Sequence, residues 1–122
     1  MPNQLTEMTS YNIVTTDFPF LEKPSNTKKR PALVLTKSVG PYGLVIVAFI
    51  TSNIDLCEPT DIIIEQGQNE FSRTGLTKTS LIQLHKLFTL PLSELHDNIG
   101  SLSPEKSNEV QQKLKILFNL TD

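Results

Sequence analysis

Cysteine is almost absent from this chain, since Cys57 is the single thiol among its 122 residues. One cysteine excludes an internal disulfide and a cysteine-based zinc site, and it is typical of a reducing cytosol. We therefore expect a cytoplasmic protein. The two histidines, His85 and His96, have no cysteine near them in the sequence, so we predict no metal site.

Long apolar runs are also missing. The longest, Leu44–Ile50, has seven residues, whereas about 20 are needed to cross a bilayer. The first ten residues are polar and include Glu7, which does not fit a secretory signal peptide. The chain has no glycine-rich phosphate loop, no dinucleotide fingerprint and no G-x-S-x-G elbow. We expect no cofactor and no membrane partner, so chemistry must come from polar groups at strand ends and in loops.

Charge of one sign is not in excess. Eleven basic and 13 acidic residues give a net charge of −2, which excludes a strongly basic nucleic-acid-binding coat but not a local basic patch. A chain of this length buries enough surface for one core without disulfide or metal staples. We predict a flexible segment over residues 1–10 and a single domain over residues 11–122.

What the sequence does contain is a series of β-strand patterns. Two apolar runs, 31–36 and 44–51, flank a turn marked by Gly40 and Gly43, and this predicts an antiparallel hairpin. Residues 80–85 alternate apolar and polar side chains, which predicts a half-buried strand. The expected strands cover residues 11–18, 31–36, 44–51, 61–65 and 80–90.

The C-terminus changes to a helical period. Residues 103–105 offer a serine N-cap, a proline at the first helical position and an acid in the first turn. From Val110 on, apolar residues recur at i, i+4 and i+7, so we predict a helix over residues 104–119. The fold class is therefore mainly β with a C-terminal helix (α+β), a small barrel of five or six strands.

Three consecutive cations, Lys28, Lys29 and Arg30, stand directly before Pro31. Such a run is often no more than a solvated, solubilising surface. Pro31, however, keeps the backbone of Arg30 out of the helical region and directs the chain into a strand. A guanidinium fixed at a strand entrance can be aimed at a phosphate. Both interpretations stay open at this point.

Thr51, Ser52 and Asn53 follow the longest apolar strand. They are either an ordinary strand end or part of a site. In a hairpin, the start of one strand lies beside the end of the other, which would bring the Thr51 hydroxyl close to Arg30. Such a pair can hold a phosphodiester and stabilise charge that grows on its oxygens.

Four segments of the chain resemble the MazF/PemK toxins, the toxin halves of bacterial type II toxin–antitoxin modules. They read IVTTDFPF, KKRPALVL, VIVAFITSN and SLIQLHKLFTL, in the order and spacing of that family, and the resemblance covers most of residues 11–118. It implies an SH3-like barrel of the MazF/PemK/CcdB type, usually a homodimer. It also implies a metal-independent endoribonuclease that cleaves single-stranded RNA and is held inactive by a cognate acidic antitoxin.

The same resemblance implies an active site. In the family, the arginine of the R-P pair and the hydroxyl of the I-T-S segment act on the phosphate, and these match Arg30 and Thr51 here. The implied reaction is attack by the ribose 2′-OH, leaving a 2′,3′-cyclic phosphate and a 5′-OH. We expect RNA contacts from Lys28, Lys29, Ser52, Asn53, Ser25 and Gln83. Other cations that would extend a positive groove are Lys37, Arg73, Lys78 and Lys86.

The chain departs from the family pattern before the first strand, where Tyr11-Asn12 replaces the usual G-D, and at three positions of the implied site. Ser25 stands where many relatives carry a glutamate, and Gln83 and His85 stand where relatives often carry an arginine and an aspartate. His85 is a candidate for the acid–base work of the missing carboxylate, or else a partly buried histidine of a strand. The alternative function is a catalytically inactive or gyrase-poison-like toxin that acts by binding, through its C-terminal helix.

Overall fold

A computed structural model describes residues 11–17 and 29–120. Within them, six strands form one antiparallel sheet in the order β4-β5-β3-β2-β1-β6, and a single α-helix follows. The expected fold class, mainly β with a C-terminal helix, is confirmed. The bounds are β1 Asn12–Asp17, β2 Lys29–Val34, β3 Leu44–Thr51, β4 Ile62–Ile64, β5 Ser80–Pro91, β6 Leu95–Ser101 and α1 Pro104–Leu117, with 3-10 turns η2 Ile54–Leu56, η3 Phe71–Thr74 and η4 Leu92–Glu94. The segment predicted to be flexible, residues 1–10, lies outside the described residues.

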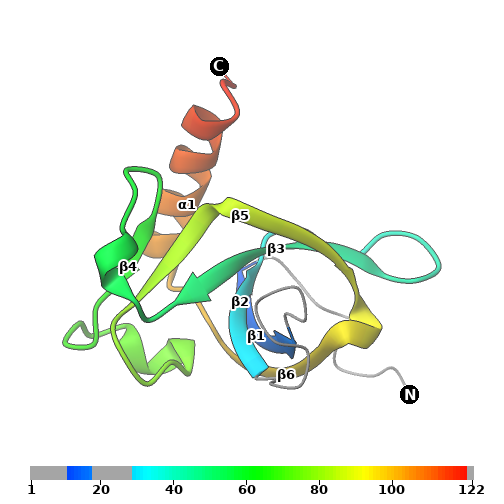
Figure 1. Cartoon of the computed structure of the whole chain (residues 1–122), viewed down its shortest axis with the longest axis horizontal. Coiled ribbons are helices and arrows are strands. Elements are labelled where there is room, and N and C mark those ends of the chain that lie inside the picture. The colour runs from blue at the N-terminus through cyan, green and yellow to red at the C-terminus, as the bar shows by residue number, and fades with distance from the viewer. Residues whose placement is uncertain (1–10, 18–28, 121–122) are drawn as a thin grey trace.

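The sheet curls into a barrel-like ring that does not close. Figure 1 shows the long strand β5 bending round until the chain passes through η4 into β6 at the opposite side of the ring. No pairing among the described strands joins β4 to β6, so these two strands are the edges of the sheet. β2 and β3 lie near the middle of the sheet, where the predicted hairpin places them.

Apolar side chains gather on both faces of the sheet. Inside the ring, Val14, Ala32 and Val47 belong to one buried cluster. The other cluster, which includes Ile82 and Leu84 of β5, receives Val110 from α1. The helix therefore covers the outer face of one half of the sheet.

β5 differs from its prediction. We expected a half-buried strand, but all residues from Ser80 to Leu84 are buried, because this half of the strand has the ring on one face and the helix-side core on the other. Beyond Leu84 the pairing with β3 is irregular: Phe49 lies opposite Gln83, whereas the next residue, Ala48, lies opposite Leu87.

α1 begins as predicted and ends earlier. The Ser103 hydroxyl accepts a hydrogen bond from the Lys106 N–H at 3.2 Å, and a proline occupies the first turn. The helix ends at Leu117 instead of residue 119 because Asn119 adopts a left-handed conformation, with φ at 61°. The N–H of Leu120 then bonds to the Lys115 carbonyl at 2.8 Å, which satisfies a carbonyl of the last turn.

Candidate functional site

The hairpin register brings the two residues of chief interest together. The β2–β3 pairing begins with Ala32 opposite Phe49, and Arg30 and Thr51 each stand two residues beyond this pair on their own strands. Both residues line one surface hollow of about 400 Å³. We call it the Arg30 hollow, and its described lining residues are Lys29, Arg30, Pro31, Ile50, Thr51, Ser52, Leu76, Thr77, Lys78 and Ser80.

The composition of the Arg30 hollow suits an anion. Three of its described lining residues are cations, and four carry hydroxyl groups, while none is a carboxylate. The cations are Lys29, Arg30 and Lys78, and the hydroxyls belong to Thr51, Ser52, Thr77 and Ser80. Hydrogen bonds between charged donors and phosphate oxygens are among the strongest that proteins make.

The Thr51 hydroxyl is oriented by the turn that follows β3. Its Oγ1 accepts a hydrogen bond from the Asn53 N–H at 3.1 Å, which leaves the hydroxyl hydrogen available to donate. The Asn53 carboxamide oxygen in turn accepts from the Asp55 N–H at 3.3 Å and caps η2. Asn53 therefore has a structural part in shaping this turn, whereas the exposed Ser52 lines the hollow.

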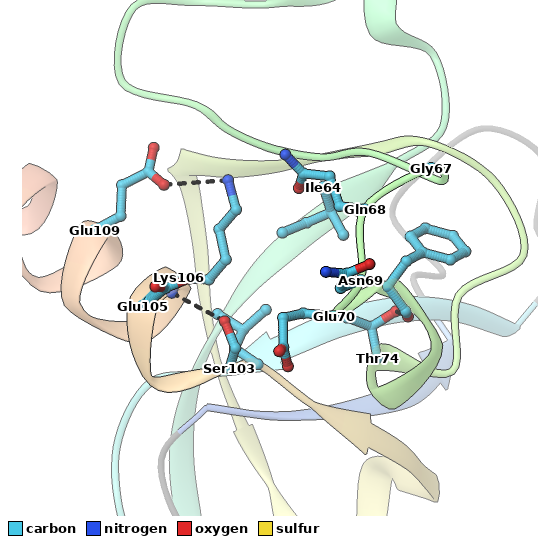
Figure 2. A pocket seen from close by; sticks show the side chains of 12 residues that line it. Ile64, Gly67, Gln68, Asn69, Glu70, Thr74, Ser103, Glu105, Lys106 and Glu109 are labelled. Carbon is cyan, nitrogen blue, oxygen red and sulfur yellow. Dashed lines mark hydrogen bonds and ion pairs between the residues drawn. The ribbon is translucent and has the colours of Figure 1, made fainter.

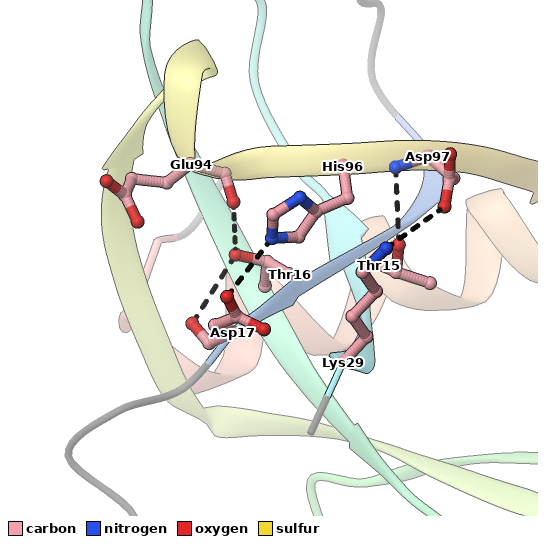
Figure 3. Close-up of polar contacts among 7 residues, drawn as sticks. All are labelled: Thr15, Thr16, Asp17, Lys29, Glu94, His96 and Asp97. Carbon is pink, nitrogen blue, oxygen red and sulfur yellow. Dashed lines mark hydrogen bonds and ion pairs between the residues drawn. The ribbon is translucent and has the colours of Figure 1, made fainter. Parts of the chain in front are cut away.

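Arg30 is the partly buried cation of the site. No described carboxylate lies within ion-pair distance of its guanidinium, so it can direct its donors to a ligand. Lys29, by contrast, holds its Nζ 4.0 Å from Asp97 Oδ2 of β6, and both side chains are more than half exposed. Figure 3 shows this pair beside the side chain of Thr15, whose Oγ1 accepts from the Asp97 N–H at 3.2 Å.

A network of polar contacts connects β1, which pairs with β2, to the segment formed by η4 and β6. His96 Nε2 lies 3.2 Å from Asp17 Oδ2, and the buried Thr16 donates its hydroxyl to the Glu94 carbonyl at 2.6 Å (Figure 3). These contacts join the end of β1 to η4 and to β6. Because Asp17 lies opposite Lys29 in the β1–β2 register, the network holds the point where β2 begins.

Besides β2 and the end of β3, the Arg30 hollow is lined by the segment 76–80. Two glycines determine where this segment lies. Gly75 has φ at 74°, and a Cβ there would lie 2.1 Å from the Ile99 carbonyl oxygen. A Cβ on Gly100 of β6 would lie 2.3 Å from the Arg73 carbonyl oxygen. The backbone after η3 therefore packs directly on β6, and this contact sets where the next residues of the chain lie.

Thr77 and Ser80 are lining residues that the sequence did not identify. The Ser80 hydroxyl donates to the Lys78 carbonyl at 2.8 Å, which holds the backbone at the entrance of β5. A polar stretch after Gly75 was visible in the sequence, but it resembled an ordinary connection. Its position against β6 depends on contacts between distant segments.

Other predicted site residues lie elsewhere. His85 does not line the hollow; it is exposed instead of partly buried, and its Nδ1 lies 2.7 Å from Thr60 Oγ1. Gln83 is 5% exposed, and its Oε1 has no hydrogen-bond partner. Lys28 and Ser25 fall outside the described residues.

A second and larger hollow, of about 800 Å³, lies between the segment before η3 and the start of α1. Figure 2 shows acidic side chains on its walls, with Glu70 on one side and Glu105 and Glu109 on the helix. Lys106 is the single cation among its described lining residues and is paired with Glu109 at 3.2 Å. Its excess of carboxylates makes this hollow a poor site for a phosphate.

Residues 11–17 and 29–120 contain no group of three or more His, Cys, Asp or Glu side chains that could hold a metal ion. No helix in the same part of the chain is long and apolar enough to span a membrane.

Comparison with known proteins adds a family and a fold. Residues 9–118 match the family described as PemK-like, MazF-like toxin of type II toxin-antitoxin system. Among solved structures, the Mycobacterium tuberculosis toxin MazF-mt6 is 22% identical with a TM-score of 0.69, covering 91% of this chain and 99% of that one. An endoribonuclease in complex with its cognate antitoxin from a mycobacterial species is 17% identical with a TM-score of 0.68, covering 94% and 98%. The MazE-MazF complex from Deinococcus radiodurans is 18% identical with a TM-score of 0.66, covering 94% and 98%.

Proposed function

Because the chain belongs to the PemK-like, MazF-like toxins of type II toxin–antitoxin systems, we propose that it is an endoribonuclease that cleaves single-stranded RNA without a metal ion. The observation that carries this proposal is the Arg30 hollow. It combines an arginine that has no described carboxylate partner with an oriented threonine hydroxyl, and no described lining residue is acidic. That combination is what a phosphodiester needs from a protein surface.

In the proposed reaction, the scissile phosphate lies in the Arg30 hollow. The ribose 2′-OH attacks the adjacent phosphorus while the bond to the 5′-oxygen breaks. A base takes the proton of the 2′-OH, and an acid gives a proton to the leaving oxygen, so the products are a 2′,3′-cyclic phosphate and a 5′-OH. Arg30 and the Thr51 O–H donate hydrogen bonds to the phosphate oxygens, whose negative charge grows in the transition state.

His85 is our candidate for one of the two proton transfers. In the tautomer whose Nδ1–H donates to the Thr60 hydroxyl, Nε2 carries the free lone pair and can take a proton from a ligand; in the doubly protonated ring, Nε2–H can give one. His85 does not line the hollow, so this role requires that bound RNA extend from Arg30 towards β5.

Several binding roles belong to the same proposal. We propose RNA contacts from Lys28, Lys29, Ser52, Asn53 and Ser25. Gln83 was expected to be a sixth, but it is 5% exposed and outside the hollow, so we do not propose an RNA contact for it. We further propose that the chain forms a homodimer and binds a cognate acidic antitoxin. The antitoxin proposal is supported by two structural neighbours, an endoribonuclease in complex with its cognate antitoxin and MazE-MazF from Deinococcus radiodurans.

The test is cleavage of a long single-stranded RNA by the purified protein in EDTA. We expect cleavage by the parent chain and a loss of about a hundredfold or more in Arg30→Ala, because a main donor to the transition state is removed. Lys37→Ala is the matched control, since this exposed cation lies between β2 and β3 and does not line the hollow. Equal cleavage by the two variants, both folded, would rule out Arg30 as a catalytic residue.

One observation favours a second candidate function, a toxin that acts by binding another protein. The end of α1 and the residues that follow it expose three large apolar side chains, Ile116, Phe118 and Leu120, at 73%, 54% and 62%. If RNA stays intact with the parent chain and Phe118→Ser relieves growth arrest, the binding function replaces the nuclease.

A further inference from the structure

β4 is an edge strand whose free side needs protection. Its three residues are all isoleucine, a residue of high β propensity, and Ile63 is 37% exposed. On one side, β4 pairs antiparallel with β5, from Ile62 opposite Ile82 to Ile64 opposite Ser80. No described strand pairs with its other side. An open, apolar strand edge is a template on which another chain can add a strand.

Two lysines of α1 occupy the hydrogen-bonding positions of that missing strand. Lys106 Nζ donates to the Ile63 carbonyl at 2.9 Å, and Lys113 Nζ donates to the Asp61 carbonyl at 3.0 Å. Carbonyls two residues apart point to the same side of a strand. Asp61 and Ile63 therefore direct their oxygens away from β5, and both oxygens are satisfied by ammonium groups.

The neighbouring backbone groups are satisfied as well. The Asp61 N–H donates to the Glu58 carbonyl at 2.9 Å, and the Glu65 carbonyl accepts from the Gln68 N–H at 3.1 Å. Lys113 also donates to the Pro59 carbonyl at 2.9 Å. Few backbone N–H and C=O groups along this edge therefore remain available to pair with a further strand.

The position of α1 makes the two lysine contacts possible. Lys106 and Lys113 lie seven residues apart, about two helical turns, so they project from the same side of the helix. Val110, between them, is fully buried in the core and fixes the helix against the sheet. Figure 2 shows Lys106 extending from α1 beside Glu109, with which it forms an ion pair at 3.2 Å. This pairing restricts the lysine side chain.

We propose that α1 seals the outer edge of β4 through Lys106 and Lys113, so that a second copy of this chain cannot add its own β4 to the sheet. The second copy is the relevant partner because the same isoleucine strand is present at equal concentration in every molecule. In the symmetric antiparallel arrangement centred on Ile63, Asp61 of one copy would face Glu65 of the other. Like charges directly opposite are unfavourable, so these acids add to the lysine seal.

The test removes the ammonium donors while it keeps an unbranched side chain of nearly the same length. The variant carries Lys106→Met and Lys113→Met, which delete the donors, together with Glu65→Gln, which deletes the opposed charge. We expect its mass from light scattering to reach at least twice the parent's mass as concentration rises, whatever the oligomeric state of the parent. The matched control carries Lys37→Met, Lys115→Met and Glu94→Gln and is expected to keep the parent's mass.

A further substitution separates edge pairing from general loss of structure. Ile63→Pro removes an N–H that points away from β5 and sets a proline ring on the open edge, where proline is tolerated. Added to the triple variant, whose edge is open, it is expected to restore the parent's mass. The proposal is overturned if the triple variant keeps the parent's mass at all concentrations, or if it associates and Ile63→Pro does not reverse this. RNA cleavage is a separate readout, because neither lysine lines the Arg30 hollow.

Discussion

The Thr51 hydroxyl oxygen accepts a hydrogen bond within the protein, whereas its O–H remains available to donate to a ligand. Because its oxygen accepts from the Asn53 N–H, we expect Thr51→Ser to keep most of the cleavage rate. Thr51→Val has nearly the same volume but no donor, and it should lose about a hundredfold in kcat/KM, the usual effect of removing one transition-state donor. The measurement is cleavage of a fluorogenic RNA, with thermal unfolding as the check on folding. Equal rates for the two variants would contradict this role.

Asp97 weakens the positive charge of Lys29. The pair is long, at 4.0 Å, and exposed, so it adds little to stability. Its removal leaves Lys29 free to face RNA, and we expect Asp97→Asn to tighten RNA binding about two- to fivefold at low salt, the range expected for one exposed ion pair. Fluorescence anisotropy with a labelled single strand measures this.

The charge-matched control for Asp97→Asn is Glu105→Gln, whose residue lines the other hollow. The effect of Asp97→Asn should fade in 1 M salt, where exposed charges are screened. A gain that survives high salt, or an equal gain from Glu105→Gln, would show that Lys29 is not the cause.

At the residue scale, the sequence predicted the site residues whose positions depend on a single hairpin. Arg30 and Thr51 were paired because Pro31 directs the chain into a strand and the strand register follows from a local turn. Thr77 and Ser80 were missed, because their place in the hollow depends on the packing of residues after η3 against β6. No pattern within that stretch encodes a contact with a strand 20 or more residues later.

At the scale of elements, the contact between η3 and β6 positions one wall of the Arg30 hollow. A methyl group on Gly100 would meet the Arg73 carbonyl oxygen at 2.3 Å, so Gly100→Ala must push the chain after η3 away from β6. We expect a cleavage rate at least tenfold lower and a reduced melting temperature, although residue 100 does not line the hollow. Circular dichroism and RNA cleavage measure the two effects.

Gly67→Ala is the control for this displacement, since a Cβ at position 67 would meet no atom within 4 Å. It should leave both the melting temperature and the cleavage rate near the parent values. If Gly100→Ala behaves like Gly67→Ala, the wall of the hollow does not depend on this contact.

The elements differ in how much of each was visible in the sequence. β3 has the predicted bounds, Leu44–Thr51, because eight consecutive apolar or β-branched residues leave few other structures. β6 was not predicted: its residues His96, Asp97 and Asn98 are polar and exposed, and it forms because β1 offers a free edge. The burial of β5 on both faces likewise depends on α1, which comes later in the chain.

For the whole molecule, a net charge of −2 limits how strongly RNA can be held by electrostatics. The described part of the Arg30 hollow contributes three cations. Each neutralised phosphate of a single strand gives a slope of about −0.7 in log K against log salt, so we expect a slope of roughly −2. Titrations of a non-cleavable 2′-deoxy strand at several salt concentrations measure it. A slope of roughly −5 or steeper would require a much larger basic surface than this one.

The chemistry of the RNA ends tests the central claim most directly. The account predicts that a long single-stranded RNA, digested in EDTA, gives fragments with a 2′,3′-cyclic phosphate at one end and a 5′-OH at the other, because the ribose 2′-OH is the nucleophile. Mass spectrometry of the fragments distinguishes these ends from all others. Fragments with a 3′-OH and a 5′-phosphate, or the same ends formed equally fast by Arg30→Ala, would contradict it.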